Sequence, residues 1–320
     1  MAQAGSAEGS SMVQVLPGLY LGGWAEAGSA LGPLVGSVLM VDTEEPEPAE
    51  LGKRILHIPA LDQPDTDLLS RLDECAAFLS AARRDGGGLA ALVRCHAGVS
   101  RSVAVVTAYL MKTNNLTFEE AYAAVKAAKP DAKMNEGFEW QLKLYEAMGC
   151  KVDTTSAVYK QYRLQKVTEK FPELHSMPRE VFAVDPTTVS QTLNSEALYR
   201  CRKCRRSLYR SSSILSHAEG NGPAAFARKR IPEPALLHAD GQAKCTSYFI
   251  EPVQWMEPVL LGVMEGQLLC PKCTSKLGSF SWRGEQCSCG RWVTPAFQIH
   301  KSRVDEVQAL PIYGRQTFKI

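Results

Sequence analysis

A cysteine, a glycine-containing loop and an arginine lie between two apolar runs, in the segment CHAGVSRS at 95–102. A thiolate is a strong nucleophile, and the N-terminus of a helix favours the ionised form of a thiol. The amides of a loop turned at Gly98 can surround a phosphate group. Arg101, six positions after Cys95, can bind two phosphoryl oxygens, and Ser102 can hydrogen-bond the sulfur as it leaves a phosphocysteine. This spacing indicates nucleophilic attack on a phosphate ester.

The segments that must position this loop alternate between strand-like and helix-like patterns. Runs rich in β-branched residues predict strands over 13–22, 37–43, 54–60 and 89–95. Apolar residues at helical spacing predict helices over 67–84, 102–113, 118–129 and 135–148. Thr117 and Asn135 stand where helix caps are expected. Strands that alternate with helices favour an α/β sheet.

The chain changes character near residue 150. Residues 1–150 hold 12 Lys and Arg against 19 Asp and Glu, whereas residues 151–320 hold 24 against 15. Seven of the ten cysteines lie between positions 201 and 289. We therefore expect an α/β domain over 1–150, a helical and loop connector over 151–197 and a small β-rich domain over 198–320. A long loop is expected over 218–242.

The cysteine-rich part has the spacing of metal knuckles, in Cys201-x-x-Cys204, Cys270-x-x-Cys273 and the tighter pair Cys287-x-Cys289, with Cys245 alone. Two thiols presented by such a turn form half of a tetrahedral zinc site. Two zinc ions need eight ligands, and seven cysteines supply one too few. The eighth ligand is expected among His217, His238 and His300.

Composition excludes several classes of protein. Hydrophobic residues make up 45% and charged residues 22% of the chain, as in soluble globular proteins. No apolar run reaches the ~18 residues that a membrane span needs, and the first residues do not resemble a secretory signal. We expect a reducing compartment, where cysteines serve metals or catalysis rather than disulfides.

Three segments resemble the dual-specificity (cysteine-based) protein tyrosine phosphatases: VLPGLYLGG at 15–23, CHAGVSRS at 95–102 and NEGFEWQL at 135–142. The resemblance implies the cysteine-phosphatase fold, a central sheet flanked by helices. It implies that Cys95 is the nucleophile, Arg101 the phosphate clamp and Asn135 a support for the loop. The remaining phosphate-binding positions would be His96, Ala97, Gly98, Val99 and Ser100.

The same resemblance points to a general acid in HIPALDQPDTDLLS at 57–70. The leaving oxygen needs a proton, and the family's acid follows a strand. Asp62 is the expected acid, ahead of Asp65 and of Asp67, which more naturally caps the next helix. One departure from the family is Arg94, which precedes the nucleophile where histidine is usual. We expect it to alter the reactivity of the thiol or the rate without abolishing activity.

Two pairings of the metal ligands are open. CRKC followed by CPKCTSKLGSFSW resembles the Yippee-like, β-tent type of zinc site. That resemblance implies one site of Cys201, Cys204, Cys270 and Cys273 and a second of His217, Cys245, Cys287 and Cys289. The alternative is a ribbon-like site of Cys270, Cys273, Cys287 and Cys289, with the other four residues forming the second. Both pairings use the same eight residues.

A catalytic domain followed by this cysteine-rich tail, including CTSYFIEPVQWM at 245–256 and CSCGRWVTPAFQIHK at 287–301, resembles the zinc-tailed atypical members of the dual-specificity phosphatases over nearly the whole chain. This resemblance implies a phosphatase that acts on phosphotyrosine and phosphoserine or phosphothreonine in proteins. It implies two structural zinc ions, no cofactor for catalysis, a place in nucleus and cytoplasm, and a link to maturation of the large ribosomal subunit. No membrane partner is expected. A phosphate pocket that acts on RNA or another non-protein phosphate is a further possibility.

An alternative hypothesis is a binding or assembly factor that engages a pre-ribosomal particle or RNA through the basic zinc domain. The first knuckle is surrounded by Arg200, Arg202, Lys203, Arg205, Arg206 and Arg210. In this hypothesis the interleaved Tyr199 and Tyr209 stack on bases. Three tryptophans are expected in the core of the domain instead: Trp255, Trp282 and Trp292.

Overall fold

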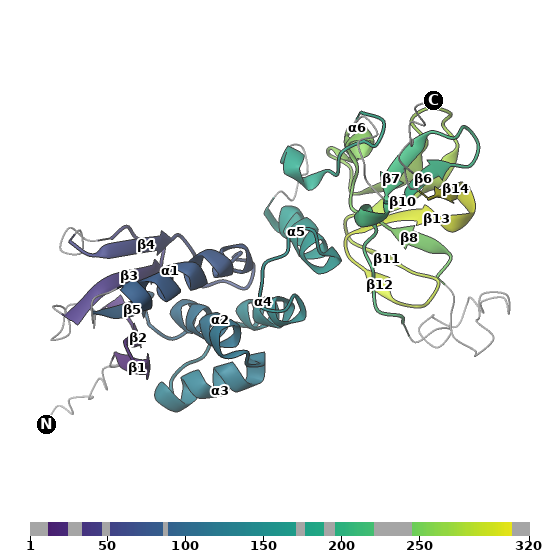
Figure 1. Cartoon of the computed structure of the whole chain (residues 1–320). Helices are drawn as coiled ribbons and strands as arrows, with labels where there is room; N and C mark the ends of the chain where they lie inside the picture. The colour runs from purple at the N-terminus through teal and green to yellow at the C-terminus, as the bar shows by residue number, and fades with distance from the viewer. Residues whose placement is uncertain are drawn as a thin grey trace, which may run out of the picture. The chain divides into compact units, whose positions relative to one another are not determined.

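The computed structural model describes residues 12–24, 34–46, 52–85, 89–170, 177–188, 196–220 and 245–308. The chain divides into two compact units, Met1–Asp153 and Thr154–Ile320 (Figure 1). The predicted loop over 218–242 lies outside the described residues from position 221 onward.

The first unit is built on a five-stranded sheet in the order β1-β2-β5-β3-β4. β1 pairs antiparallel with β2, and the other neighbours are parallel. Its strands are β1 (Val13–Leu16), β2 (Leu19–Gly22), β3 (Val35–Val41), β4 (Arg54–Ile58) and β5 (Ala90–Arg94). The strand predicted over 13–22 is therefore a hairpin, turned at Pro17 and Gly18. The carboxyl ends of the parallel strands share one edge of the sheet, where ligands bind in α/β folds.

Among the described residues of the first unit, three helices contact the sheet, and a fourth packs against two of them (Figure 1). The three are α1 (Leu72–Asp85), α2 (Arg101–Asn114) and α3 (Phe118–Ala128), and the fourth is α4 (Glu136–Ala147), which packs against α2 and α3. α2 is buried from Arg101 to Met111 and contacts the other three helices. Thr117 caps α3 in a capping box with Glu120, and Asn135 caps α4. No described helix has the length and apolar composition needed to cross a membrane.

Asp73 of α1 ties the helices of the first unit together. Its carboxylate accepts hydrogen bonds from Lys112 Nζ of α2 at 2.5 Å and Tyr145 Oη of α4 at 2.8 Å. It also accepts one from the Val152 amide at 2.9 Å. Burial by itself raises the pKa of Asp73, but these three donors outweigh it, so the pKa lies below its ordinary value.

We expect Asp73→Asn to destabilise the first unit at neutral pH and not in acid. A depressed native pKa stabilises the fold above the unfolded-state pKa of about 4, and this stabilisation is lost as the pH falls through the native value. The difference in stability between wild type and Asp73→Asn is measured at about pH 7 and about pH 3. The measurement is the urea concentration at which the amides of α1 and α4 lose their protection from hydrogen exchange. Glu44→Gln, at an exposed position, is the control. A gap between wild type and Asp73→Asn that is equal at both pH values would contradict the prediction.

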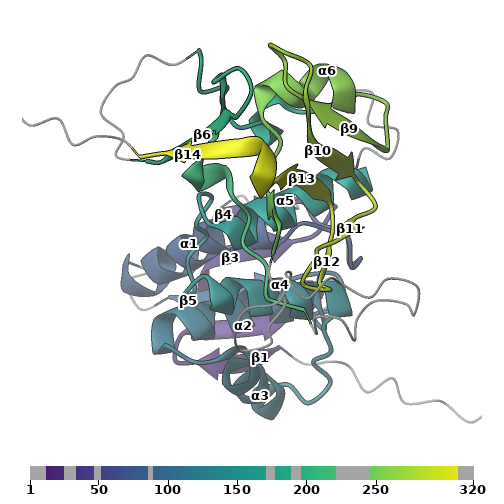
Figure 2. The same ribbon diagram turned by 90° about the vertical axis from the view of Figure 1, so that its right-hand side faces the viewer.

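In its described residues the second unit contains α5 (Ala157–Lys170), short strands, α6 (Glu257–Leu260) and four 3-10 turns. β8, β13, β10 and β9 form one antiparallel sheet, β14, β6 and β7 a second, and β11 and β12 a hairpin. β6 and β14 lie side by side (Figures 1 and 2). The bounds are β6 (Leu198–Cys201), β7 (Ser207–Arg210), β8 (Ser247–Phe249), β9 (Glu265–Leu269), β10 (Lys276–Ser281), β11 (Glu285–Gln286), β12 (Trp292–Val293), β13 (Ala296–His300) and β14 (Val304–Val307).

The core of the second unit contains Trp282, whose indole meets the Phe297 ring edge-on with centroids 5.0 Å apart. Leu164 and Val167 of α5 belong to the same buried cluster. The segment predicted as a connector over 151–197 thus contributes to this core, because α5 buries its apolar face there. Of the three tryptophans expected in the core, Trp282 is buried and Trp255 partly buried, whereas Trp292 is 58% exposed and that prediction was wrong.

Candidate active site and candidate metal centres

The loop at 95–100 leaves the carboxyl end of β5 and is held on two sides. The Trp24 amide, just after β2, donates to the His96 carbonyl at 3.0 Å, and the Lys133 amide donates to Val99 at 2.9 Å. Gly98 has φ +69°, and a Cβ there would lie 2.6 Å from backbone atoms of Gly22 and Gly23. Only glycine satisfies both the left-handed conformation and this close approach.

Cys95 stands at the base of this loop with its Sγ 3.1 Å from Ser102 Oγ. α2 starts at Arg101, and Ser100 occupies its N-cap position without a side-chain cap. The first amides of α2 are therefore available to an anion, with the positive end of the helix dipole behind them. His96 and Ala97 are exposed, so the loop can be approached from solvent.

Arg101 is anchored by a residue that the sequence analysis missed, Asp42, which directly follows β3. Arg101 Nη1 donates to Asp42 Oδ1 at 2.8 Å and to the Ala60 carbonyl at 3.0 Å. Both side chains are buried. Arg101 Nε is buried and has no hydrogen-bond partner among the described residues. One edge of the guanidinium is thus fixed, and the Nε edge remains for phosphoryl oxygens. The sequence offered one signal for Asp42. It directly follows a strand whose carboxyl end lies at the same edge of the sheet as Cys95.

We expect Asp42→Ala to weaken the capture of phosphate. It leaves a buried cation without its partner, which costs about 3–5 kcal/mol of stability, and it frees Arg101 to move, where a 1 Å misplacement costs on the order of 10²-fold in rate. The inhibition constant of vanadate and kcat/KM for para-nitrophenyl phosphate measure the effect. Asp42→Asn keeps an acceptor and should lose less. Unchanged vanadate inhibition in folded Asp42→Ala would contradict the role.

Asp62 lies in the exposed loop after β4 and is connected to the loop at 95–100, which carries the proposed nucleophile and is called the nucleophile loop below. Its Oδ1 accepts hydrogen bonds from Ser100 Oγ at 2.7 Å and from Asn135 Nδ2 at 2.8 Å. The Asn135 amide also donates to Ser100 Oγ, at 3.3 Å. Asp67 instead accepts from the amide and hydroxyl of Ser70, as expected of a cap. Asp62 thus contacts the loop at 95–100 through Ser100, whereas Asp67 caps the following turn.

Arg94 ends β5 immediately before Cys95 and is 1% exposed. Its guanidinium lies over the Trp24 ring, 4.3 Å from the centroid. Stacking on an aromatic face is a favourable way to bury such a cation. The residue that departs from the family pattern is thus accommodated by packing, behind a loop whose backbone keeps its hydrogen bonds to Trp24 and Lys133.

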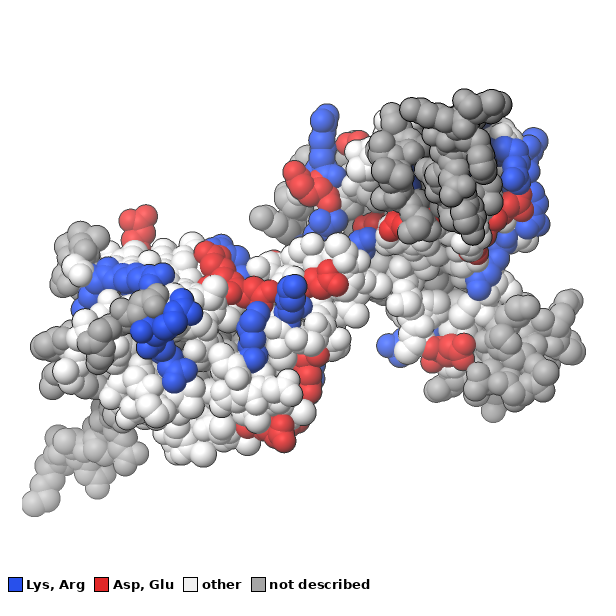
Figure 3. Space-filling view, viewed as in Figure 1, with Lys and Arg blue, Asp and Glu red and all other residues white. Residues whose placement is uncertain are grey.

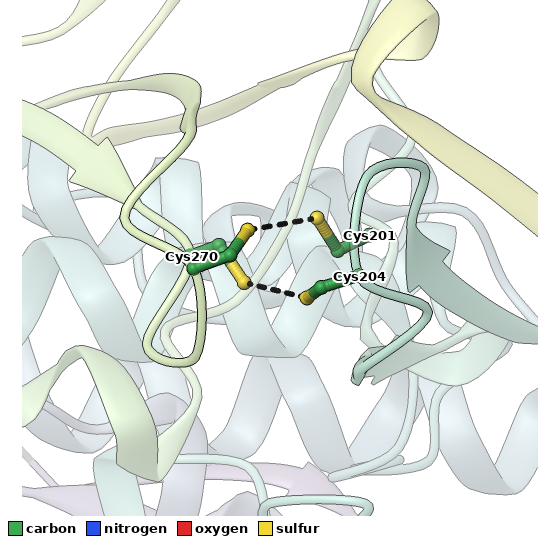
Figure 4. Close-up of side chains that lie close together, drawn as sticks. Cys201, Cys204 and Cys270 are labelled. Atoms are coloured by element: carbon green, nitrogen blue, oxygen red, sulfur yellow. Dashed lines mark hydrogen bonds between the residues drawn. The ribbon is translucent and has the colours of Figure 1, made fainter.

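The first cysteine cluster joins two knuckles that lie far apart in the chain (Figure 4). Cys201 Sγ is 3.8 Å from Cys273 Sγ, and Cys204 Sγ is 3.5 Å from Cys270 Sγ. All four sulfurs lie within 4.8 Å of one another. Four converging thiols at such separations fit a tetrahedral zinc ion. Hydrogen bonds from Ser275 are the largest cause that lowers the pKa of Cys273, to about 6.

The two knuckles of this cluster have the same backbone structure. In each knuckle, the backbone amide of the first cysteine donates a hydrogen bond to the carbonyl five residues later. These bonds run from Cys201 to the Arg206 carbonyl and from Cys270 to the Ser275 carbonyl. The residue four positions after each first cysteine has positive φ, 64° at Arg205 and 55° at Thr274. The similar spacing C-x-x-C therefore encodes one local structure twice, between β6 and β7 and between β9 and β10.

The second cluster consists of His217, Cys245, Cys287 and Cys289, whose ligand atoms also lie within 4.8 Å of one another. His217 Nε2 is 3.7 Å from Cys245 Sγ and 3.5 Å from Cys289 Sγ. Burial lowers the pKa of His217, which favours the neutral imidazole that a metal binds.

The grouping of the ligands corresponds to the first of the two pairings. Of the other candidate ligands, His300 has its Nδ1 3.1 Å from Ser247 Oγ, and it is outside both groups. His238 lies outside the described residues.

Lys and Arg side chains gather at the end of the second unit near β14, with acidic side chains among them (Figure 3). Arg202 and Arg205 both pair with Asp305, and Arg206 pairs with Asp185. The suggested stacking of bases on Tyr199 and Tyr209 is wrong. These rings are 5% and 0% exposed and stack on each other, with centroids 4.8 Å apart, because their strands pair at this register.

Comparisons with known proteins found relatives by sequence and by structure. Residues 19–148 match the family described as "Dual specificity phosphatase, catalytic domain". The chain is 64% identical over 322 residues to "Dual specificity protein phosphatase 12" of Homo sapiens. The match covers 97% of this chain and 92% of the human protein. It is 33% identical over 285 residues to "Tyrosine-protein phosphatase YVH1" of Saccharomyces cerevisiae, covering 80% and 78%. A crystal structure of human DUSP28 is 40% identical, covers 43% of this chain and 95% of that chain, and has a TM-score of 0.40.

Proposed function

Because this chain belongs to the dual-specificity protein phosphatases, we propose that Cys95, Arg101 and Asp62 hydrolyse phosphate esters of tyrosine and of serine or threonine in proteins. One observation carries the assignment of residues. Ser100 Oγ connects the nucleophile loop with Asp62 at 2.7 Å, which supports a shared site for the proposed nucleophile, phosphate clamp and acid.

In the first step the Cys95 thiolate attacks phosphorus in line with the departing oxygen, and the P–O bond to the substrate breaks. The Nε edge of Arg101 and the loop amides bind the equatorial oxygens. Asp62 Oδ1 accepts two hydrogen bonds, so Oδ2 carries the proton that passes to the leaving oxygen.

In the second step water attacks phosphocysteine. Asp62, now ionised, takes a proton from the water, and the S–P bond breaks. The Ser102 hydroxyl, 3.1 Å from Sγ, stabilises the thiolate that departs. Inorganic phosphate then leaves. The proton that Asp62 took from the water leaves it protonated for the next cycle.

The two cysteine clusters are proposed to hold one structural zinc ion each. Their donor sets, four thiols and three thiols with an imidazole, are those of closed structural sites. The clusters join segments of the second unit that the sequence separates by up to 72 residues, from Cys201 to Cys273. In this proposal the metal holds the second unit together and takes no part in hydrolysis.

The test of the proposed function is phosphate release from matched phosphotyrosyl and phosphoseryl peptides by the full chain and by Asp62→Asn. We expect release from both peptides by wild type and a loss on the order of 10²-fold or more in the variant. Release only from RNA ends or another non-protein phosphate would overturn the assignment of phosphoproteins as substrates.

A second function is supported by the charge of the second unit. Residues 151–320 carry an excess of nine basic residues, and a basic surface favours polyanions. We infer that this unit directs the phosphatase to a pre-ribosomal particle or its RNA, in nucleus and cytoplasm. If catalysis is dispensable there, cells with Cys95→Ser mature large ribosomal subunits, and cells with Cys270→Ser do not. The opposite pattern would assign the role to catalysis.

A further inference from the structure

The loop that carries Asp62 is fastened to the first two turns of α4 along its whole length. Here the acid loop means residues 60–69. At its start, Asn135 Nδ2 donates to Asp62 Oδ1 at 2.8 Å. At its middle, Gly137 lies against Pro64, where a Cβ on the glycine would fall 2.1 Å from the Pro64 carbonyl oxygen.

Gln141 fastens the last part of the acid loop. Its Oε1 accepts hydrogen bonds from the amides of Leu68 and Leu69 at 2.9 and 2.8 Å, and its Nε2 donates to the Thr66 carbonyl at 2.8 Å. The Gln141 side chain is 1% exposed. A buried amide that satisfies three backbone groups holds a loop firmly, because any displacement leaves those groups unpaired.

Gln141 and Gly137 both contact the segment that carries the acid. Asn135, Gly137 and Gln141 lie at the cap position and on the first two turns of one helix. Successive residues along α4 thus contact successive parts of the acid loop: Asn135 contacts its start, Gly137 its middle and Gln141 its end.

We propose that Gln141 is a positioning residue for the general acid. It holds the acid loop on α4 so that Asp62 stands over the nucleophile loop before substrate arrives. The inference rests on the proposed function, because it needs Asp62 as the proton donor. It adds that the distance of Asp62 from the leaving oxygen is set by a buried side chain two helical turns away.

The chemical consequence is a dependence on the leaving group. A well-placed acid neutralises the departing oxygen, so rates for good and poor leaving groups are similar. When the acid is displaced, a poor leaving group such as phenol, with a pKa of about 10, loses most. A more acidic phenol departs without a proton and loses little. A loss of folded protein would instead reduce both rates equally.

The experiment measures kcat/KM of the full chain for para-nitrophenyl phosphate and for phenyl phosphate, in wild type and Gln141→Met, which has similar volume and no hydrogen-bonding amide. Lys143→Met is the matched control, since Lys143 is exposed on the same helix and pairs with Glu119. Asp62→Asn gives the limit for complete loss of the acid. We expect Gln141→Met to lose roughly 10- to 100-fold on phenyl phosphate, the cost of a misplaced group, and less than about threefold on the nitrophenyl ester.

Gly137→Ala provides a second route if Gln141→Met folds poorly. Alanine is a good helix former, and its methyl group displaces the acid loop at Pro64 instead of removing hydrogen bonds. The same leaving-group dependence is expected.

Equal losses on both esters, or no loss in folded Gln141→Met and Gly137→Ala, would overturn the positioning role. Failure of the proposed function has a different signature. In that case wild type hydrolyses neither ester through Cys95, or Asp62→Asn shows the same leaving-group dependence as wild type.

Discussion

Replacing Cys95 with serine is expected to reduce hydrolysis of every phosphate ester by on the order of 10⁴-fold or more. A serine hydroxyl in this loop remains protonated, and none of the described contacts offers it a base of the kind that activates serine nucleophiles. The remaining groups act as a unit with the nucleophile, so little of their rate enhancement survives its removal. The variant should still bind phosphate, because Arg101 and the loop amides are unchanged.

Phosphate release from para-nitrophenyl phosphate gives the rate, and titration with a phosphotyrosyl peptide gives the affinity. Cys150→Ser is the matched control, since Cys150 is a partly exposed thiol at the end of the same unit. Bound zinc should be equal in all three proteins. Turnover by Cys95→Ser that approaches wild type would rule out the cysteine mechanism. Loss of peptide affinity together with rate would show that the loop itself had collapsed.

Removal of zinc is expected to unfold the second unit and to leave the first unit active. Structural zinc contributes an apparent binding free energy of about 10–16 kcal/mol at neutral pH. That equals or exceeds the whole stability of a typical domain, about 5–15 kcal/mol. All eight proposed ligands belong to Thr154–Ile320, and none to Met1–Asp153. α5 should lose its structure with the metal, because Leu164 and Val167 are buried in the same core as Trp282.

Hydrogen exchange resolved by peptide, with and without a strong chelator, measures this separation of the two units. We expect amides of β9, β10 and α5 to lose protection, while those of α2 and α4 keep it and para-nitrophenyl phosphate is still hydrolysed. Cys270→Ser should reproduce the effect without chelator. Full protection of the second unit after complete removal of metal would contradict a structural role.

The amino-acid sequence by itself determined the parts of this protein that depend on neighbours along the chain. The series of strand, Cys95, Gly98, Arg101 and apolar helix has one local solution, because the turn, the helix start and the strand end are encoded within a few residues. The caps at Thr117 and Asn135 are local in the same way. Each cysteine knuckle is a local turn too, so the ligand candidates could be recognised from spacing alone.

Only the tertiary structure decided which distant groups meet. Asp42 reaches Arg101 across 59 positions and Gln141 reaches Leu69 across 72, and no pattern within either segment encodes the partner. The pairing of the cysteine knuckles depends on which strands become neighbours, so both pairings fitted the same spacing. Burial of Tyr199 and Tyr209 and exposure of Trp292 follow from the faces that the sheets cover. Long-range packing determines this burial and exposure. A residue's type sets its preference for burial, but the surface that packs against it depends on the tertiary structure.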